Sequence, residues 1–279
     1  MNVKIAKEAG FCFGVKRAMK MAWDELEKSE DGIYALGPLI HNKQAVSKYE
    51  EKGLVTIDNI DDIPDSKNMI IRSHGVAENV YNDALKKQIT IVDTTCPFVK
   101  KIHKIVKEYS LKGYEVIVIG DSKHPEVIGI NGWCNNSATI IKTLEDLENV
   151  ELDNSKKYCV VAQTTINSQL YLKIADKISE ISSDVIFNNT ICSATKVRQQ
   201  SARQLSKEVD CMIVIGGKHS SNTQKLVNIC EEFVETFAIE TKENLEIESL
   251  NKYETIGITA GASTPDWIIE DVITFIKNI

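Results

Sequence analysis

The hydrophobic residues of this chain fall into short, separate runs with polar residues between them. Residues 114–120 and 211–217 are rich in valine and isoleucine and close with glycine, a pattern typical of strands buried in a parallel sheet. Weaker runs of the same type occupy residues 33–37, 68–75, 158–165 and 255–263. We therefore expect strands at all of these places.

Between the predicted strands, apolar residues recur every three or four positions, which is the repeat of one helical face. One such face lies within residues 13–29 and consists of Val15, Ala18, Met19, Ala22, Trp23 and Leu26. A second face lies within residues 97–112 and consists of Val99, Ile102, Val106 and Tyr109. Strands that alternate with helices form parallel sheets with helical crossovers, so the sequence predicts an α/β protein.

Three cysteines recur in the same register of this alternation. Cys12, Cys96 and Cys192 each stand directly before a predicted helix, and each helix leads to a strand that ends in glycine and a polar loop. The polar residues that follow the cysteines at a spacing of 28 or 29 residues are His41, His124 and Ser220. A further strand in each copy ends in a second polar cluster, at residues 72–75, 163–165 and 261–264. The order of elements therefore indicates three copies of one unit.

The repeat divides the chain into three expected α/β lobes, each a small, mainly parallel sheet with flanking helices. Their boundaries are residues 1–96, 97–191 and 192–279, and the strand within residues 1–12 is also a candidate member of the third lobe. Ligands of open α/β sheets bind beyond the carboxyl ends of the strands. We therefore expect three pseudo-three-fold-related lobes whose polar loops and cysteines meet around a central cleft.

The composition limits the kinds of molecule that we expect the protein to bind. With a formal net charge of −7, the chain lacks the excess of lysine and arginine that nucleic-acid binding favours. It has no apolar run of about 18 residues that would cross a bilayer, and its first residues lack the apolar stretch of a signal peptide. We therefore expect a cytoplasmic protein with neither a nucleic-acid partner nor a membrane partner.

The chain has seven cysteines and no CxxC pair. Disulfides are disfavoured in the cytoplasm, which leaves burial, catalysis or metal binding. Burial as a small apolar side chain suits Cys159, Cys211 and Cys230, and it is the default for Cys134, whose role the sequence leaves undetermined. The three repeated cysteines lie instead at strand-to-helix junctions, where a helix start favours the thiolate, so we favour metal or cluster ligation there. Three ligands without a fourth leave one position open for a substrate.

Histidines gather in the predicted polar loops. Three of the five histidines, His41, His74 and His124, lie in equivalent loops of the repeat. His103 is expected on the surface of a helix, and His219 is expected to be structural. Three histidines in equivalent loops favour a functional role over an ordinary surface role.

Hydroxyl and amide side chains accompany these histidines. The set consists of Thr164, Thr165, Ser220, Ser221, Asn222 and Ser263. Residues 220–222 fit helix capping and diphosphate binding, and the two roles are compatible, since a helix start presents free amide groups from which a side-chain oxygen or a phosphate can accept. Thr264 is expected to cap a helix that has Pro265 at its first position. Glu126 lies in a predicted loop, where it is either solvated or a proton relay.

Nine short motifs run in order along the whole chain. They are GFCFGVKRA (10–18), LGPLIHN (36–42), RSHG (72–75), DTTCPFV (93–99), HPEVIG (124–129), AQTT (162–165), TICSAT (190–195), GGKHSSNT (216–223) and GITAGASTP (257–265). Together they resemble one family, that of 4-hydroxy-3-methylbut-2-enyl diphosphate reductase, the last enzyme of the non-mevalonate isoprenoid pathway. No motif departs from the family at a position that carries the chemistry.

The resemblance implies a role for each candidate residue. Cys12, Cys96 and Cys192 would hold one [4Fe–4S] cluster, whose open apical iron has no protein ligand and would bind the substrate hydroxyl. Glu126 would donate protons with the help of Thr164. The residues that would surround the substrate, mainly its diphosphate, are His41, His74, His124, Thr164, Thr165, Ser220, Ser221, Asn222 and Ser263.

The resemblance also implies a reaction and a fold. The substrate would be (E)-4-hydroxy-3-methylbut-2-enyl diphosphate, and a two-electron, two-proton reductive dehydroxylation would yield isopentenyl diphosphate and dimethylallyl diphosphate. The electrons would come from an external ferredoxin or flavodoxin. The family fold consists of three α/β lobes around a central cleft, which agrees with the repeat described above.

Three other readings compete with this one. A quinolinate-synthase-like dehydratase would also use three cysteines and an open iron, but without net reduction. An iron or oxygen sensor would hold a labile cluster and usually bind nucleic acid, which the acidic composition disfavours. A zinc hydrolase with cysteine and histidine ligands would take up zinc and stay colourless.

Overall fold

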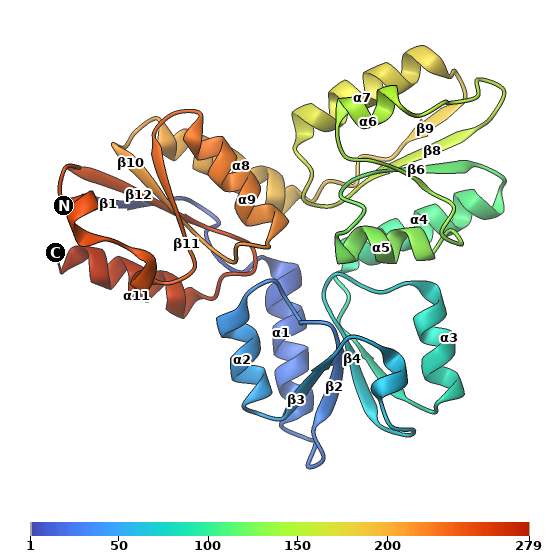
Figure 1. The fold of residues 1–279 in the computed structure, drawn as a ribbon, viewed down its shortest axis with the longest axis horizontal. Coiled ribbons are helices and arrows are strands. Elements are labelled where there is room, and N and C mark those ends of the chain that lie inside the picture. Colours follow the sequence, from blue (N-terminus) through green and yellow to red (C-terminus); the bar gives the residue numbers. More distant parts are fainter. Residues whose placement is uncertain (1, 279) are drawn as a thin grey trace. The chain divides into compact units, whose positions relative to one another are not determined.

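The computed structural model describes residues 2–278, and their strands form three four-stranded sheets (Figure 1). Sheet A has the order β1 (Asn2–Ile5), β12 (Thr255–Ala260), β10 (Cys211–Ile215), β11 (Glu235–Ile239). Sheet B has the order β3 (Leu54–Ile57), β2 (Ile33–Leu36), β4 (Asn68–Ile71), β5 (Thr90–Asp93). Sheet C has the order β7 (Thr139–Ile141), β6 (Glu115–Ile119), β8 (Tyr158–Ala162), β9 (Val185–Phe187). Every strand pair is parallel, which confirms the predicted fold class.

Helices connect the strands. They are α1 (Phe13–Leu26), α2 (Lys43–Glu50), α3 (Glu78–Lys86), α4 (Pro97–Leu111), α5 (Pro125–Gly132), α6 (Leu144–Glu148), α7 (Ser168–Ile181), α8 (Ser193–Ser206), α9 (Ser221–Glu231), α10 (Ile247–Leu250) and α11 (Asp266–Lys277), with 3₁₀ turns at Ile60–Asp62 and Lys242–Asn244. Within residues 2–278, none of them combines the length and the apolarity that a bilayer crossing requires. The expected strands and the two expected helices at 13–29 and 97–112 are all present, with ends shifted by a few residues.

The described chain divides into two compact units. The first unit contains sheet A and comprises residues 2–16, 40–51 and 193–278, and the second contains sheets B and C and comprises residues 17–39 and 52–192. The N-terminal strand β1 pairs with β12 in parallel, with Val3 opposite Ile256. Sheet A is therefore built from both ends of the sequence.

Helices cover both faces of sheet A in the first unit. Because successive residues of a strand point to opposite faces, Met212 and Val214 of β10 pack on one side, against residues of α8 and α9. Ile213 and Ile215 pack on the other side, against residues of α11. All four side chains are fully buried, which explains the unbroken apolar run in the sequence.

Sheet C has the same construction in the second unit (Figure 1). Ile117 and Ile119 of β6 pack against α7, and Val116 and Val118 pack on the opposite face, against α4 and α5. At about 25 cal/mol for each Å² of apolar surface removed from water, each such side chain contributes roughly 1.5–3 kcal/mol. These two layers hold the ends of β6 and β8, where the candidate residues lie.

Gly132 lets α5, which covers sheet C, lie close to the loop that follows β4 of sheet B within the second unit. A Cβ atom on Gly132 of α5 would lie 2.2 Å from the Cβ of Ala77, and one on Gly129 would lie 3.5 Å from the backbone of Val76. The indole N–H of Trp133 donates to the carbonyl of Val76 over 2.9 Å. The loop that follows β4 is therefore fixed against the end of α5.

The prediction that His103 lies on a helix surface is wrong. His103 is 3% exposed, and its ring stacks on Trp133 with 5.2 Å between the ring centres. It also fills the space left by Gly75, where an added Cβ would meet the histidine Cε1 at 2.6 Å. Burial lowers the pKa of His103 to about 4, with a smaller opposing effect from Asp93.

Candidate functional site

The three repeated cysteines occupy equivalent places in the structure. Each follows the edge strand of a sheet: Cys12 after β1, Cys96 after β5 and Cys192 after β9. Each is only partly buried and directly precedes a helix: α1, α4 and α8 respectively. Each of the three thiols therefore lies at a helix start, where the first backbone amides have no partner within the helix.

The backbone amide of each cysteine is bound to the polar loop of the neighbouring strand. Cys12 N–H donates to the carbonyl of Ala262 over 3.2 Å in the first unit. In the second unit, Cys96 N–H donates to Ser73 and Cys192 N–H donates to Thr164, each over 3.0 Å. These acceptors lie in the second polar cluster of each copy, so candidate ligands and candidate substrate loops are joined directly.

The other four cysteines are buried, as predicted: Cys134, Cys159, Cys211 and Cys230. Burial raises the pKa of all four thiols, and that of Cys159 and Cys211 to about 12. A thiol with so high a pKa is a poor ligand and a poor nucleophile. The sequence-based prediction that these four cysteines are buried is therefore confirmed.

The prediction that Glu126 lies in a loop is wrong, because the residue lies in the first turn of α5. The side chain of His124 caps this helix by accepting from the amide of Glu126 over 3.1 Å, and Pro125 takes the first helical position. Glu126 is only 2% exposed. The helix start thus buries a carboxyl group that loop placement would have left solvated.

Glu126 and Thr164 form a buried pair inside the second unit. Oε1 of Glu126 accepts from the amide of Thr164 over 2.6 Å, and Oε2 accepts from its hydroxyl over 2.8 Å. The carbonyl of Thr164 also accepts from the N–H of Cys192, so Thr164 links the carboxyl group of Glu126 to a candidate ligand. The next residue, Thr165, accepts from Gln163 Nε2 through its hydroxyl over 3.2 Å.

The second unit also brings two predicted histidines together. The rings of His74 and His124 meet edge to face, with 5.4 Å between their centres and 87° between their planes. His74 follows β4 of sheet B, and His124 follows β6 of sheet C. The second unit therefore gathers five predicted groups, its two histidines, Glu126, Thr164 and Thr165, beside two of the three cysteines.

The first unit gathers the remaining predicted side chains around the start of α9. Ser220 caps this helix by accepting from the amide of Thr223 over 3.3 Å, and Ser221 and Asn222 form its first turn. Ser263 donates its hydroxyl to the carbonyl of His41 over 3.3 Å. A Cβ on Gly217 would lie 2.4 Å from that same carbonyl oxygen, so the loop of His41 also packs against the approach to α9.

Asn222 gives this group its chemical character. Its side chain is 4% exposed, yet neither amide atom has a hydrogen-bond partner among the residues that the structure describes. Buried polar groups are normally paired, because an unpaired one costs about 1–3 kcal/mol. An amide held in this way beside a helix start suits an anionic ligand, since the amide groups of the helix offer further donors.

Thr264 does not cap a helix, contrary to the prediction. Its hydroxyl donates to the carbonyl of Ile215 at the end of β10 over 2.9 Å. Pro265 is the residue before the helix rather than its first residue, and α11 begins at Asp266. Thr264 thus braces the end of a central strand, next to Ser263.

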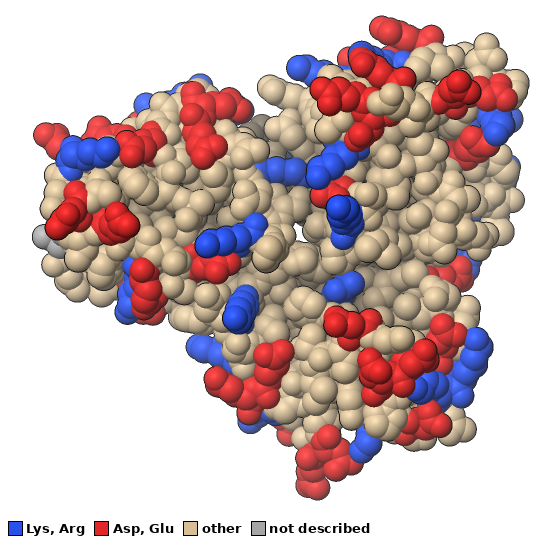
Figure 2. Space-filling view, viewed as in Figure 1, with Lys and Arg blue, Asp and Glu red and all other residues tan. Residues whose placement is uncertain are grey.

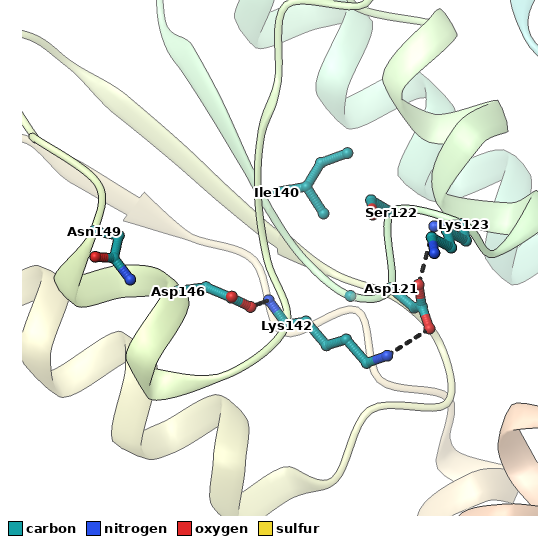
Figure 3. Close-up of a pocket in the computed structure, with 8 residues that line it drawn as sticks. Asp121, Ser122, Lys123, Ile140, Lys142, Asp146 and Asn149 are labelled. Carbon is teal, nitrogen blue, oxygen red and sulfur yellow. Dashed lines mark hydrogen bonds and ion pairs between the residues drawn. The ribbon is translucent and has the colours of Figure 1, made fainter.

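A cavity of about 500 Å³ lies elsewhere in the second unit, beyond the ends of β6 and β7 (Figure 3). Its lining residues are Gly120, Asp121, Ser122, Lys123, Ile140, Lys142, Asp146 and Asn149. Lys142 Nζ lies 2.8 Å from Asp121, and this ion pair holds the pKa of the aspartate below its usual value. None of the predicted site residues lines this cavity, and two of its charged residues, Lys142 and Asp121, already form an ion pair.

Sequence reasoning missed two arginines near the cysteines. Arg198 is 1% exposed and donates to the carbonyls of Glu8 and Gly10, just before Cys12. Arg17 donates to the carbonyls of Thr94 and Thr95, just before Cys96. Both follow a repeated cysteine by five or six residues, which was the only signal in the sequence.

Known proteins resemble this chain along nearly its whole length. The profile of the LytB protein family matches residues 3–277. A 4-hydroxy-3-methylbut-2-enyl diphosphate reductase of Clostridioides difficile is 71% identical over the full length of both chains, and one of Alkaliphilus oremlandii is 53% identical over the full length of both.

Solved structures are similar as well. The E-1-hydroxy-2-methyl-but-2-enyl-4-diphosphate reductase of Plasmodium falciparum superposes with a TM-score of 0.94 at 28% identity, over 98% of this chain and 87% of that one. A second reductase structure, described as the terminal enzyme of the non-mevalonate pathway, is 41% identical with a TM-score of 0.73 over all of both chains. The sequence and fold matches both extend over nearly the whole chain, and on these grounds the protein belongs to the LytB family.

Proposed function

We propose that this protein is a 4-hydroxy-3-methylbut-2-enyl diphosphate reductase. It would convert the (E)-substrate, two electrons and two protons into water and either isopentenyl diphosphate or dimethylallyl diphosphate. The observation that carries the proposal is the buried pair of Glu126 and Thr164, bound through the threonine carbonyl to Cys192. The 71% identity to a reductase of this name over the full chain supports the same assignment.

The proposed cofactor is one [4Fe–4S] cluster held by Cys12, Cys96 and Cys192. The donor set fits such a group, because these three thiols are only partly buried at helix starts while the other four are buried inside the core. Iron–sulfur clusters are held by cysteine thiolates. When bound, the cluster would pass the two electrons from the external donor to the substrate one at a time and, at an iron without a protein ligand, supply a Lewis acid for the hydroxyl group.

The proposed role of Glu126 is proton delivery to the departing hydroxyl oxygen. Its carboxyl is shielded from water and contacts the hydroxyl of Thr164 over 2.8 Å, so a proton can pass between them without bulk solvent. The amide of Thr164 holds the other carboxyl oxygen and fixes its orientation. We propose that Thr164 relays the proton while the hydroxyl group leaves as water.

The diphosphate would be bound by neutral donors rather than by a cluster of arginines. The first unit contributes the helix start at Ser220 and Ser221, the buried amide of Asn222, the hydroxyl of Ser263 and the residue His41. The second unit contributes His74, His124, Thr164 and Thr165. Helix amides and hydroxyls favour phosphate through hydrogen bonds and the helix dipole.

A protein electron donor, either a ferredoxin or a flavodoxin, is part of the proposal, and α4 provides a candidate docking face. Directly after Cys96, this helix exposes Phe98 (44%) together with Lys101 and Lys104, although the chain as a whole carries a net charge of −7. Figure 2 shows one face of the molecule, on which acidic and basic side chains both occur. A basic and apolar surface beside the cluster suits an acidic one-electron carrier.

Charge reversal tests this docking face. Lys101→Glu with Lys104→Glu should raise the KM for the protein donor several-fold and leave the dithionite-driven rate unchanged. Lys173→Glu on α7 is the matched control, since Lys173 is also exposed and also lies beside an exposed apolar side chain, Leu172. Equal KM values in the double variant and the control would remove α4 from the docking model.

The proposed function is tested by an anaerobic Mössbauer spectrum of iron-enriched protein with and without the substrate. We expect one iron of four to change its signal when the substrate is added, and electrons to be consumed in proportion to product. A cubane that ignores this substrate, or product without electron consumption, would favour a dehydratase. Stoichiometric zinc in place of iron would favour a hydrolase, and a cluster protein that turns over no substrate would favour a sensor. We further propose a cytoplasmic location, where thiols stay reduced.

A further inference from the structure

A buried arginine forms hydrogen bonds with the loop that carries Cys12. Arg198 lies in α8 of the first unit and is 1% exposed. Its Nε donates to the carbonyl of Glu8 over 2.7 Å, and its Nη2 donates to the carbonyl of Gly10 over 2.8 Å. Both acceptors belong to the segment between the end of β1 and Cys12, so one side chain holds that segment at two points.

The segment between β1 and Cys12 has an unusual backbone. After Ala6, whose amide still bonds to Ile258 of β12, the chain reverses through Glu8 (φ 61°) and Gly10 (φ 94°), both in the left-handed region. A residue other than glycine in this region is strained by of order 1 kcal/mol. Gly10 is also crowded, since an added Cβ would lie 2.9 Å from Ile269. Such a loop needs contacts from its surroundings to keep its shape.

We propose that Arg198 is a positioning residue that holds the loop of Cys12 in its ligand-presenting shape before any metal binds. The loop runs from Arg198's acceptors straight to Cys12, whose own amide is bound to Ala262. With both ends of the segment fixed, the thiol is placed at the start of α1 without help from a cluster. The functional meaning of this placement rests on the proposed role of Cys12 as a ligand.

Arginine suits this task better than lysine. Its planar guanidinium offers diverging donors in a fixed geometry, whereas a lysine ammonium is a single point that cannot reach two carbonyls in the same way. Methionine would fill a similar volume but would leave the carbonyls of Glu8 and Gly10 without their donors. A lysine at position 198 should therefore keep part of the restraint on the loop of Cys12, and a methionine should keep none of it.

The second unit repeats the arrangement at another cysteine. Nη1 of Arg17 on α1 lies 3.5 Å from the carbonyl of Thr94 and 3.4 Å from that of Thr95, directly before Cys96. These contacts are longer than those of Arg198 and come from a half-buried side chain. We expect Arg17 to act in the same sense on Cys96, with a smaller effect.

The experiment measures thiol alkylation by iodoacetamide, residue by residue, in the full-length protein after its iron has been chelated. Arg198→Lys and Arg198→Met are compared with the unchanged chain. Cys211 and Cys230 are internal controls, because they are buried in the same unit and react only when the whole unit opens. A second measurement follows the rate at which the anaerobic holoenzyme loses iron to a chelator.

The expected result is faster alkylation of Cys12 alone, by about fivefold for each hydrogen bond lost. The methionine variant should change more than the lysine variant, and both holoenzymes should lose iron faster. An unchanged Cys12 rate in Arg198→Lys, or a rise shared equally by Cys211 and Cys230, would overturn the proposal. If Cys12→Ala keeps its full iron content, the proposed function fails instead, while the alkylation test of the loop still stands.

Discussion

The buried ring of His103 makes the stability of the second unit depend on pH. In the folded protein its pKa is lowered from 6.5 to about 4, chiefly because burial disfavours the charged ring. As the pH falls below 6.5, the unfolded chain takes up this proton first, so the unfolded state gains free energy relative to the folded one. The stabilising contribution is therefore complete above pH 6.5 and is lost as the pH falls toward 4.

The size of the effect follows from the two pKa values. At about 1.4 kcal/mol for each pKa unit, the full difference corresponds to roughly 3 kcal/mol. Between pH 7 and pH 5, where most but not all of this difference is expressed, the loss is about 2 kcal/mol. The charged neighbours of the ring, Asp93 and Lys100, form an ion pair over 2.6 Å and act on the ring in opposite directions.

Urea unfolding at pH 7 and pH 5 measures this loss. His103→Phe is the control, since phenylalanine keeps an aromatic ring against Trp133 but cannot be protonated. Carboxyl groups elsewhere respond to pH in both proteins and cancel in the comparison. We expect the unchanged protein to lose about 2 kcal/mol more than the variant. Equal losses in both proteins would refute the reasoning, and would mean that the ring is charged or solvated in the folded state.

Three further predictions concern the site and its supports. Glu126→Gln should fold normally and bind substrate but turn over about 10²–10⁴-fold more slowly in a single-turnover assay, and near-normal turnover would exclude proton donation by this residue. Cys96→Ala should lose iron and sulfide by chemical analysis, whereas Cys159→Ala should retain both, and retention in the first variant would remove Cys96 from the ligand set. Gly132→Ala should lower the free energy of unfolding by about 1–3 kcal/mol, because the added methyl overlaps Ala77, and a neutral result would show that α5 can shift.

Local patterns predicted the two central strands of each sheet and the buried cysteines, because both depend on burial of apolar side chains. Three assignments were wrong, those of His103, Glu126 and Thr264, because each was inferred from a short segment without its packing. His103 lies one residue from Ile102 and on the same face of α4, but its polarity suggested the opposite face. Glu126 follows the pair His124 and Pro125, which resembles a turn but here starts a helix.

Contacts between distant segments lay outside the reach of sequence patterns. Arg198 and Glu8 are 190 positions apart, and Glu126 and Thr164 are 38 positions apart. Periodicity describes one element at a time, so it cannot show which carbonyl a buried side chain will meet. The repeated spacing of the cysteines was informative because it compared three copies rather than neighbouring residues.

The pairing of β1 with β12 also sets an order of events during synthesis on the ribosome. Sheets B and C are made of continuous stretches, and their strands can pair while the chain is still emerging. The strand β1 can pair with β12, with Asn2 opposite Thr255, only after β12 has been synthesised. The loop before Cys12 therefore takes its final shape only after β12 has been made, whereas the backbone contacts of Cys96 and Cys192 join segments that are synthesised earlier.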